Sequence, residues 1–122
     1  MPERQVVSKE LADLFKIIAH PDRIRIIEEL GQGEKDVNTL VDRLELPGPR
    51  VSQHLSLMRA NRMVEERREG RHHFYRLMQP EMANWIIDAL SFVASRASVI
   101  SKTSINKARD LWTAPSKLEA ND

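Results

Sequence analysis

The chain has 122 residues, of which 41% are hydrophobic and 30% charged, and its formal net charge is +1 at pH 7. This length fits one domain, and this composition can fill a core and argues against disorder. The absence of cysteine excludes disulfides, thiolate metal sites, cysteine nucleophiles and thiol redox sensing. No apolar run approaches a membrane span and no signal peptide opens the chain, so we expect a soluble, cytoplasmic protein without a membrane partner.

The charge is uneven along the chain. Residues 50–76 carry seven arginines and three glutamates, whereas residues 1–36 carry six basic and eight acidic residues. A concentrated basic segment in a nearly neutral chain favours a polyanionic partner. A solvated charged face is the alternative that composition alone leaves open.

Three helices are predicted in the first part of the chain, because apolar residues repeat there at helical spacing. Ser8 is the expected N-cap of the first helix, which ends before Pro21 because the residue preceding a proline disfavours helical backbone. Pro21 can begin the second helix, Gly31 and Gly33 end it, and Asp36 is the expected N-cap of the third. The inward-facing residues are Leu11, Leu14, Phe15 and Ile18, then Ile24, Ile27 and Leu30, then Val37, Leu40, Val41 and Leu44.

A turn, a fourth helix and a hairpin follow. Residues 46–49 are Leu-Pro-Gly-Pro, which predicts a short, stiff turn, and Pro49 can begin the fourth helix. Residues 63–68 and 71–77 are predicted antiparallel strands, because the Glu-Gly pair between them is a hairpin signal and the second run is rich in aromatic residues. The expected tip of this hairpin is basic. The inward-facing residues of the fourth helix are Val51, Leu55 and Met58.

Pro80 opens the last predicted helix. If residues 81–112 formed one helix, it would be roughly 48 Å long at ~1.5 Å per residue, which exceeds the ~26 Å diameter of a domain near 100 residues. So long an apolar stripe needs a partner, and a symmetric dimer is the simplest one. The alternative is a break near residues 101–104 and a chain that folds back. We expect one domain over residues 1–113 and a flexible tail over residues 114–122.

This order of elements predicts a winged helix-turn-helix: a mainly α fold with a small β-hairpin, in which helices at both ends form a dimer interface. In such a fold the second helix of the motif enters the major groove of DNA, whose ~12 Å width admits a helix and exposes the base edges. The uneven charge agrees with this assignment, since phosphates would lie against that helix and the hairpin, or wing.

Three stretches resemble the ArsR/SmtB family of small dimeric bacterial repressors: LFKIIAHPDRIRIIEEL (14–30), VSQHLSLMR (51–59) and REGRHHFYRL (68–77). The resemblance covers about residues 8–100. It implies a homodimer formed through the first and last helices, binding to an inverted-repeat operator in double-stranded DNA, and repression that an effector relieves. The expected interface residues are Leu11, Phe15, Met82, Trp85, Ile86, Ala89 and Val93.

Carried over onto this sequence, the resemblance also implies which residues contact DNA. Arg50 could bind guanine O6 and N7, and Gln53 could bind adenine N6 and N7, with phosphate contact as the alternative for both. We expect His54 to be partly buried and hydrogen-bonded within the protein, and we assign His20 no function. The expected DNA-contacting residues are Gly48, Pro49, Arg50, Ser52, Gln53 and His54 in the helix, and Arg68 and Arg71 in the wing.

The sequence departs from the family near the recognition helix. Pro47 and Pro49 stand where members often have serines, and a proline lacks the hydroxyl and the N–H that would reach a phosphate. Arg62 stands where a glycine is common, so a left-handed backbone there would be mildly strained.

Both metal sites of the family are also missing. Residues 36–38 replace the cysteine motif at the start of the third helix, and Leu90 stands where a histidine would follow Asp88. His72 and His73 are neighbours on a strand and point to opposite faces, so they cannot chelate together. We therefore expect no metal site, no cofactor and a non-metal, non-thiol mode of control, with an unidentified small molecule or protein as a possible effector.

Two classes of function remain. The first is a sequence-specific, dimeric DNA-binding regulator that acts as a repressor. The second is a winged-helix protein-interaction module with little DNA affinity, for which the proline substitutions and the modest net charge leave room. The arginine-rich segment favours the first. An enzyme is not expected, because no nucleophile–base pair, P-loop, glycine-rich nucleotide loop or paired carboxylates occur at usable spacing.

Overall fold

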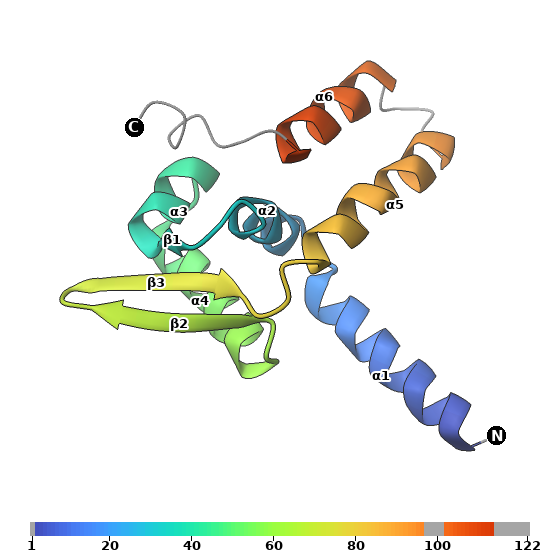
Figure 1. Ribbon diagram of the computed structural model, residues 1–122, viewed down its shortest axis with the longest axis horizontal. Coiled ribbons are helices and arrows are strands. Elements are labelled where there is room, and N and C mark those ends of the chain that lie inside the picture. Colours follow the sequence, from blue (N-terminus) through green and yellow to red (C-terminus); the bar gives the residue numbers. More distant parts are fainter. Residues whose placement is uncertain (1, 97–101, 114–122) are drawn as a thin grey trace.

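The computed structural model describes residues 2–96 and 102–113, and the structural statements below concern these residues. It is mainly helical with one small antiparallel sheet, which confirms the predicted fold class (Figure 1). The predicted flexible tail, residues 114–122, lies outside the described residues. In chain order the elements are α1 (Pro2–Ile18), α2 (Pro21–Leu30), β1 (Lys35–Asp36), α3 (Val37–Leu44), α4 (Gly48–Ala60), β2 (Val64–Glu69), β3 (His72–Leu77), α5 (Met82–Arg96) and α6 (Lys102–Thr113).

Helix α1 is longer and more isolated than the sequence predicts. It begins at Pro2, so the N-cap predicted at Ser8 is wrong. Residues 3–5 are Glu-Arg-Gln, all good helix formers, which extend the helix toward its N-terminus. No residue of α1 is buried, and the helix projects from the body of the molecule (Figure 1). It joins that body at its C-terminal end, where Ile17 and Ile18 pack against the core.

The breaks between α1, α2 and α3 follow the predicted signals. Pro21 begins α2, and the N-cap is His20, whose Nδ1 accepts a hydrogen bond from the backbone N–H of Asp22 at 3.1 Å. Gly31 ends α2. Asp36 caps α3 by accepting a hydrogen bond from the backbone N–H two residues further on. The roles predicted for Pro21, Gly31 and Asp36 are therefore confirmed.

The sheet has three strands, in the order β1-β3-β2, one more than the sequence predicts. Strands β2 and β3 pair antiparallel along their whole lengths, which confirms the hairpin. Its loop consists of Gly70 and Arg71, and Gly70 has a φ of +60°, which glycine adopts without strain. Strand β1 pairs with the other edge of β3. Its two residues are too few to produce an alternating pattern, so the sequence did not reveal it.

The hydrophobic core lies between α2, α3, α4 and the sheet. The three predicted inward residues of α4, Val51, Leu55 and Met58, are fully buried. In α2 the predicted inward residues Ile27 and Leu30 are buried, together with Ile26, whereas Ile24, which was also predicted to face inward, is only partly buried. Each side chain of this size contributes about 1.5–3 kcal/mol when it is withdrawn from water. This packing fixes the position of α4 against the start of α2.

The C-terminal helices decide between the two predicted alternatives. Helix α5 is described to Arg96 and helix α6 from Lys102, and the two pack against each other, so α6 does not extend α5 as one straight helix. Helix α6 turns back and packs against α5 (Figure 1). The carbonyl of Leu111 accepts a hydrogen bond from Gln32 Nε2 at 3.4 Å. The argument for a dimer from helix length alone is therefore wrong. None of the described helices is both long and apolar enough to cross a membrane.

Candidate nucleic-acid interface

Helix α4 exposes a polar face while its opposite face fills the core. Ser52 and Gln53 are exposed near its N-terminus. The helix begins at Gly48, one residue before the predicted start, and Pro47 in the N-cap position makes no side-chain capping hydrogen bond. The predicted loss of phosphate contacts at Pro47 and Pro49 stays a prediction. An exposed row of donors and acceptors on one helix face is what reading of base edges in a major groove requires.

Arg50, the predicted base-reading arginine, is tied to another part of the protein. Its Nε and Nη2 both lie 2.6 Å from Oδ2 of Asp22, the second residue of α2. Asp22 is only 6% exposed, whereas the side chain of Arg50 is 51% exposed. Burial acts to raise the pKa of the Asp22 carboxyl, but hydrogen bonds from Arg50 and His54 outweigh burial and hold this pKa below its usual value. Arg50 therefore reaches solvent but is not a free cation.

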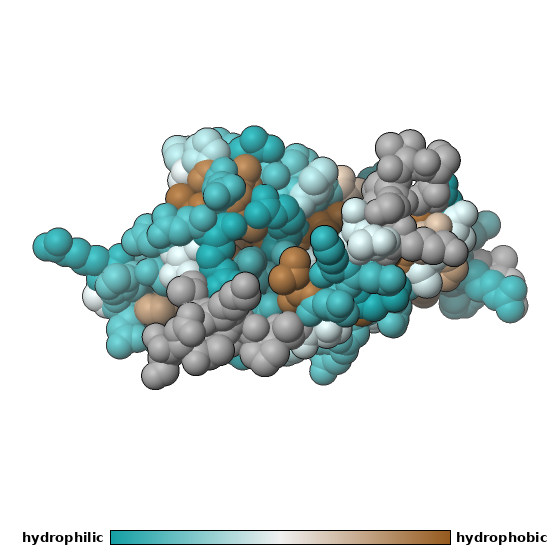
Figure 2. Space-filling view, turned by 90° about the horizontal axis from the view of Figure 1, so that it is seen from above, coloured by the Kyte–Doolittle hydropathy of each residue, from teal (hydrophilic) through white to brown (hydrophobic). Residues whose placement is uncertain are grey.

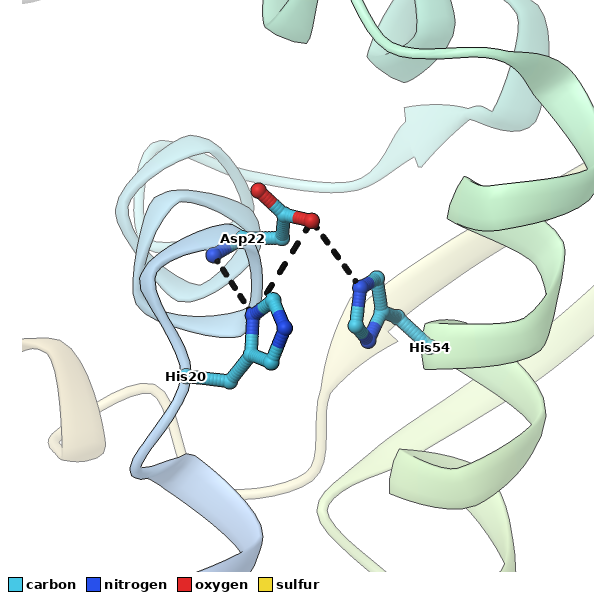
Figure 3. A group of neighbouring side chains, drawn as sticks. All are labelled: His20, Asp22 and His54. Carbon is cyan, nitrogen blue, oxygen red and sulfur yellow. Dashed lines mark hydrogen bonds and ion pairs between the residues drawn. The ribbon is translucent and has the colours of Figure 1, made fainter.

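His54 completes the contacts of Asp22. Its Nε2 lies 3.1 Å from Asp22 Oδ2, and its side chain is 14% exposed. This confirms the expectation that His54 is partly buried and hydrogen-bonded within the protein. His20 lies beside His54 at the same carboxylate oxygen, with its ring centroid 4.6 Å from that of His54 (Figure 3). The structure thus brings together two histidines that the sequence analysis treated separately and an acid that it did not single out.

A second acid, whose side chain is only 10% exposed, organises the root of the hairpin. Glu66 accepts hydrogen bonds from Arg68 Nε at 2.7 Å, Tyr75 Oη at 2.7 Å and Arg59 Nη1 at 2.8 Å. Nδ1 of His73 lies 3.3 Å away on the same carboxylate. Hydrogen bonds from Arg68 and Tyr75 lower the pKa of Glu66 to about 2. Because Glu66 is ionised and nearly buried, it binds these side chains to one another. It also pairs with Arg68, a predicted wing contact whose side chain is 71% exposed.

The next arginines of the basic segment are paired as well. Arg67 bonds to Glu34 at 2.7 Å and to Glu69 at 2.6 Å, and its guanidinium lies 4.5 Å from the ring centroid of Phe74. Arg76 pairs with Glu65. Five of the seven arginines in residues 50–76 thus have a carboxylate partner. Carboxylates therefore neutralise most of the basic segment that the charge count indicates.

Arg62 and Arg71 are the exceptions among the described residues, since neither side chain has an ion-pair or hydrogen-bond partner there. Arg62 has a φ of 59°, so the mild backbone strain predicted for a left-handed residue at this position is present. Arg71 is exposed in the two-residue loop at the tip of the hairpin. The hairpin end of the molecule is hydrophilic in Figure 2. Arg71 is therefore the wing cation that is available to a phosphate.

The predicted interface residues lie mostly on an exposed apolar surface between α1 and α5. Phe15 is 52% exposed, Trp85 49%, Leu11 45% and Val93 40%. Met82 is the exception, because it is 6% exposed and belongs to the core of the protomer. Figure 2 shows hydrophobic patches exposed on an otherwise hydrophilic face. The apolar hollow that includes this surface is lined by Phe15, Ile18, Ala19, Ile24, Trp85, Ile86, Ala89, Leu90, Val93, Arg96 and Trp112.

Comparison with known proteins agrees with this geometry. Residues 20–66 match the family model described as "Bacterial regulatory protein, arsR family". The chain is 34% identical over 96 residues to the HTH-type transcriptional repressor SmtB of Mycobacterium tuberculosis, covering 79% of this chain and 70% of that protein. It is 37% identical over 90 residues to the biofilm growth-associated repressor of Agrobacterium fabrum, covering 74% of this chain and 76% of that one.

A solved structure shows the same arrangement of elements. The crystal structure of the transcriptional repressor BigR from Xylella fastidiosa superposes with a TM-score of 0.67 at 28% identity, covering 75% of this chain and 93% of that one. The fold and the exposed α4 and hairpin define a winged helix-turn-helix DNA-binding regulator. The chain belongs to the ArsR family. This family consists of transcriptional regulators and not enzymes, in agreement with the sequence analysis.

The sequence analysis missed Asp22. It follows the His-Pro pair that ends α1, and it was counted there only as one of many acids. Its partners Arg50 and His54 lie 28 and 32 residues further along the chain. No local pattern links positions that far apart, so only the packing of α4 against α2 reveals the contact.

Proposed function

We propose that this chain is a homodimeric repressor that binds an inverted-repeat operator in double-stranded DNA. The observation that carries the proposal is the exposed polar face of α4, with Ser52 and Gln53, together with a hairpin whose tip presents Arg71 without a side-chain partner in the described part of the chain. A helix fits the major groove, and a basic hairpin reaches the adjacent backbone. Two such units related by a two-fold axis suit an inverted repeat.

Individual roles follow from side-chain chemistry. Gln53 would pair with adenine N6 and N7, and Ser52 would bind a base or a phosphate. Gly48 and Pro49, at the start of α4, would approach the sugar–phosphate backbone of DNA. The space at Gly48 is open, because a β-carbon added there would meet no protein atom within 4 Å. Arg50 would read guanine only after leaving Asp22. His54 would support α4 from inside, and Arg68 and Arg71 would serve the wing, Arg71 with its side chain already free.

The dimer would form through α1 and α5. Helix α1 has no buried residue, and Phe15 and Trp85 expose about half of their surfaces. Apolar surface of this kind is stabilised when a second copy covers it. Replacing Ile86 and Val93 together by glutamate should give monomers in light scattering and an operator affinity at least about 100-fold weaker, which corresponds to about 2.7 kcal/mol. A double variant that stays dimeric would contradict this interface.

Regulation of DNA binding would not use a thiolate, because the chain has no cysteine. It would not use the carboxylate–histidine site of the last helix either, because the chain has no histidine after position 73. The apolar hollow between α1, α5 and α6 is a candidate site for a small apolar effector, and a protein effector is the alternative. A regulator that acts on DNA in this way would work in the cytoplasm.

A protein-interaction module with little DNA affinity is the second candidate. The observation that favours it is the pairing of five arginines with carboxylates, which reduces the positive charge available to phosphates. Such a module would bind through the apolar surface of α1 and α5 and would respond weakly to salt.

Selection of bound fragments from random double-stranded DNA, followed by a salt titration on the selected sequence, separates the two. The repressor predicts a palindromic site and an affinity that falls steeply with salt, with a log–log slope of about −0.9 for each neutralised phosphate. A matched control is the same titration on a scrambled site. Failure to enrich any sequence, together with flat salt dependence, would favour the interaction module.

A further inference from the structure

The cluster of His20, Asp22 and His54 has features that the DNA-binding role does not explain. One ligand-type atom from each residue lies within 4.8 Å of the other two. Asp22 is buried, and the side chains of His54 and His20 are 14% and 35% exposed. Figure 3 shows both imidazole rings turned toward the Asp22 carboxylate, His20 from the α1–α2 junction and His54 from α4. The cluster is thus a largely enclosed set of two nitrogen donors and one oxygen donor.

This donor set is one that Zn²⁺ takes in proteins, with bonds of about 2.0–2.2 Å and a fourth position open to water. Tetrahedral bonds of that length place ligand atoms roughly 3.4 Å apart. Asp22 Oδ2 is 3.1 Å from His54 Nε2 and 3.9 Å from His20 Nδ1. All three ligand atoms lie within 4.8 Å of one another, so side-chain rotations that shorten the longer separations would complete the geometry. Nδ1 of His20 accepts a hydrogen bond from the backbone N–H of Asp22, and a metal ion bound at Nδ1 would replace this hydrogen bond, because both use the same lone pair.

Arg50 is the competitor for this site. Its guanidinium is 2.6 Å from the same Oδ2 that a metal ion would use. A divalent ion would neutralise Asp22 in its place, so the buried carboxylate would not be left unpaired. The side chain of Arg50 is half exposed, and it can turn into solvent without being buried alone.

We propose that His20, Asp22 and His54 form a binding site for a divalent transition-metal ion of the Zn²⁺ type, and that the ion displaces Arg50 from Asp22. The site lies apart from both metal sites that the family resemblance implies, at the start of the third helix and in the last helix. The expectation that the chain holds no metal rested on those two sites and on the neighbouring pair His72 and His73. It did not consider residues 20, 22 and 54 together.

Metal binding to the full-length chain tests the site directly. Titration with Zn²⁺ by calorimetry, and with Co²⁺ by visible absorption, should show one ion per chain and, for Co²⁺, the intense bands of a four-coordinate site. His20→Gln and His54→Gln should each weaken binding at least about tenfold. His72→Gln is the matched control, because His72 is an exposed histidine that contacts Asp36 instead, and it should bind as the unmodified chain does.

Arg50→Gln provides the decisive variant. If Arg50 competes with the ion, its removal should tighten binding about tenfold, corresponding to about 1.4 kcal/mol. Misfolding cannot produce a gain in affinity, so this result stays informative even if a histidine variant is unstable. Unchanged affinity in Arg50→Gln, or unchanged affinity in both His20→Gln and His54→Gln, would overturn the proposal.

The consequence for DNA rests on the proposed function. Because the ion frees Arg50, Zn²⁺ should change the operator affinity of the unmodified chain at least about threefold and leave that of Arg50→Gln unchanged. Equal shifts in both proteins would overturn the displacement of Arg50. If the metal binds as described and no DNA is bound under any condition, the proposed function fails and the site stands. If DNA is bound and the metal is not, the inference fails and the proposed function stands.

Discussion

The start of α4 and the hairpin β2–β3 each carry arginines of the basic segment, yet they hold them differently. Arg50 on α4 is bound by Asp22, an acid from a helix that lies far away in the sequence. On the hairpin, Glu66 binds Arg59 and Arg68 at the root and leaves Arg71 free at the tip. Two regions that are both rich in arginine therefore differ in how available their arginine side chains are to DNA. One offers a cation that must first be released, and the other offers a cation that is already available.

The largest expected effect concerns stability at the root of the hairpin. Glu66→Gln should lower the free energy of unfolding by about 2–3 kcal/mol, because an ionised, nearly buried acceptor of several hydrogen bonds is lost. Chemical denaturation measures this loss. Glu65→Gln is the matched control, since the ion pair of Glu65 with Arg76 is exposed on both sides and should contribute under about 1 kcal/mol. Equal losses in the two variants would contradict the role assigned to Glu66.

The same carboxylate predicts a pH dependence. The pKa of Glu66 is lowered from the ordinary 4.5 to about 2 in the folded protein, so its stabilising contribution is fully present above about pH 4.5. This contribution is lost as the pH falls from there toward 2, because the unfolded chain takes up the proton first. The stability difference between the unmodified chain and Glu66→Gln should therefore shrink between pH 6 and pH 3 in denaturation experiments. A difference that is constant over this range would mean that the pKa of Glu66 is not lowered.

Removal of Arg50 should weaken specific binding by about 1–3 kcal/mol and relax the preference at one base position. Binding to a panel of single-base operator variants measures both quantities. If Arg50→Ala weakens all sequences equally, Arg50 contacts only phosphate, and the two regions do not differ in the information that they read.

The smallest effect is expected at the tip of the hairpin. Arg71→Ala should weaken binding by about 1 kcal/mol on every sequence and reduce the salt slope by about 1, since a phosphate contact carries no base information. Lys in place of Arg71 should restore most of the affinity, because phosphate contact needs charge more than shape. A loss that depends on sequence would show that the wing reads bases, which would remove the contrast with α4.

Local signals predicted the elements that surround the site. Pro21 and Gly31 mark the two ends of α2 and Asp36 caps the start of α3, as expected. The Glu-Gly pair lies at the turn of the hairpin. The predictions of elements failed where the local signal in the sequence was weak or was overridden by other interactions. Helix α1 starts earlier than Ser8 because its polar first residues are good helix formers, and the two-residue strand β1 forms only because β3 is there to pair with it.

The candidate DNA-contacting residues were placed on the correct elements, but the state of their side chains was not predictable. Ser52, Gln53 and Arg71 are exposed as expected. The pairing of Arg50 with Asp22 was not foreseen, since it joins positions 28 residues apart on two different helices. The fold-back of α6 onto α5 was left open for the same reason, because it depends on a contact between segments and not on the periodicity of either one.

By itself, the sequence determined the order of the helices and the hairpin, the family, and which positions of α4 face outward. These properties depend on spacing, caps and turns, which act within a few residues. Only the tertiary structure decided which arginines are neutralised, which acids are buried, and that two histidines from separate segments face one carboxylate. Those outcomes depend on the distance between charges in space and on how far burial strengthens their interaction, neither of which spacing along a chain determines.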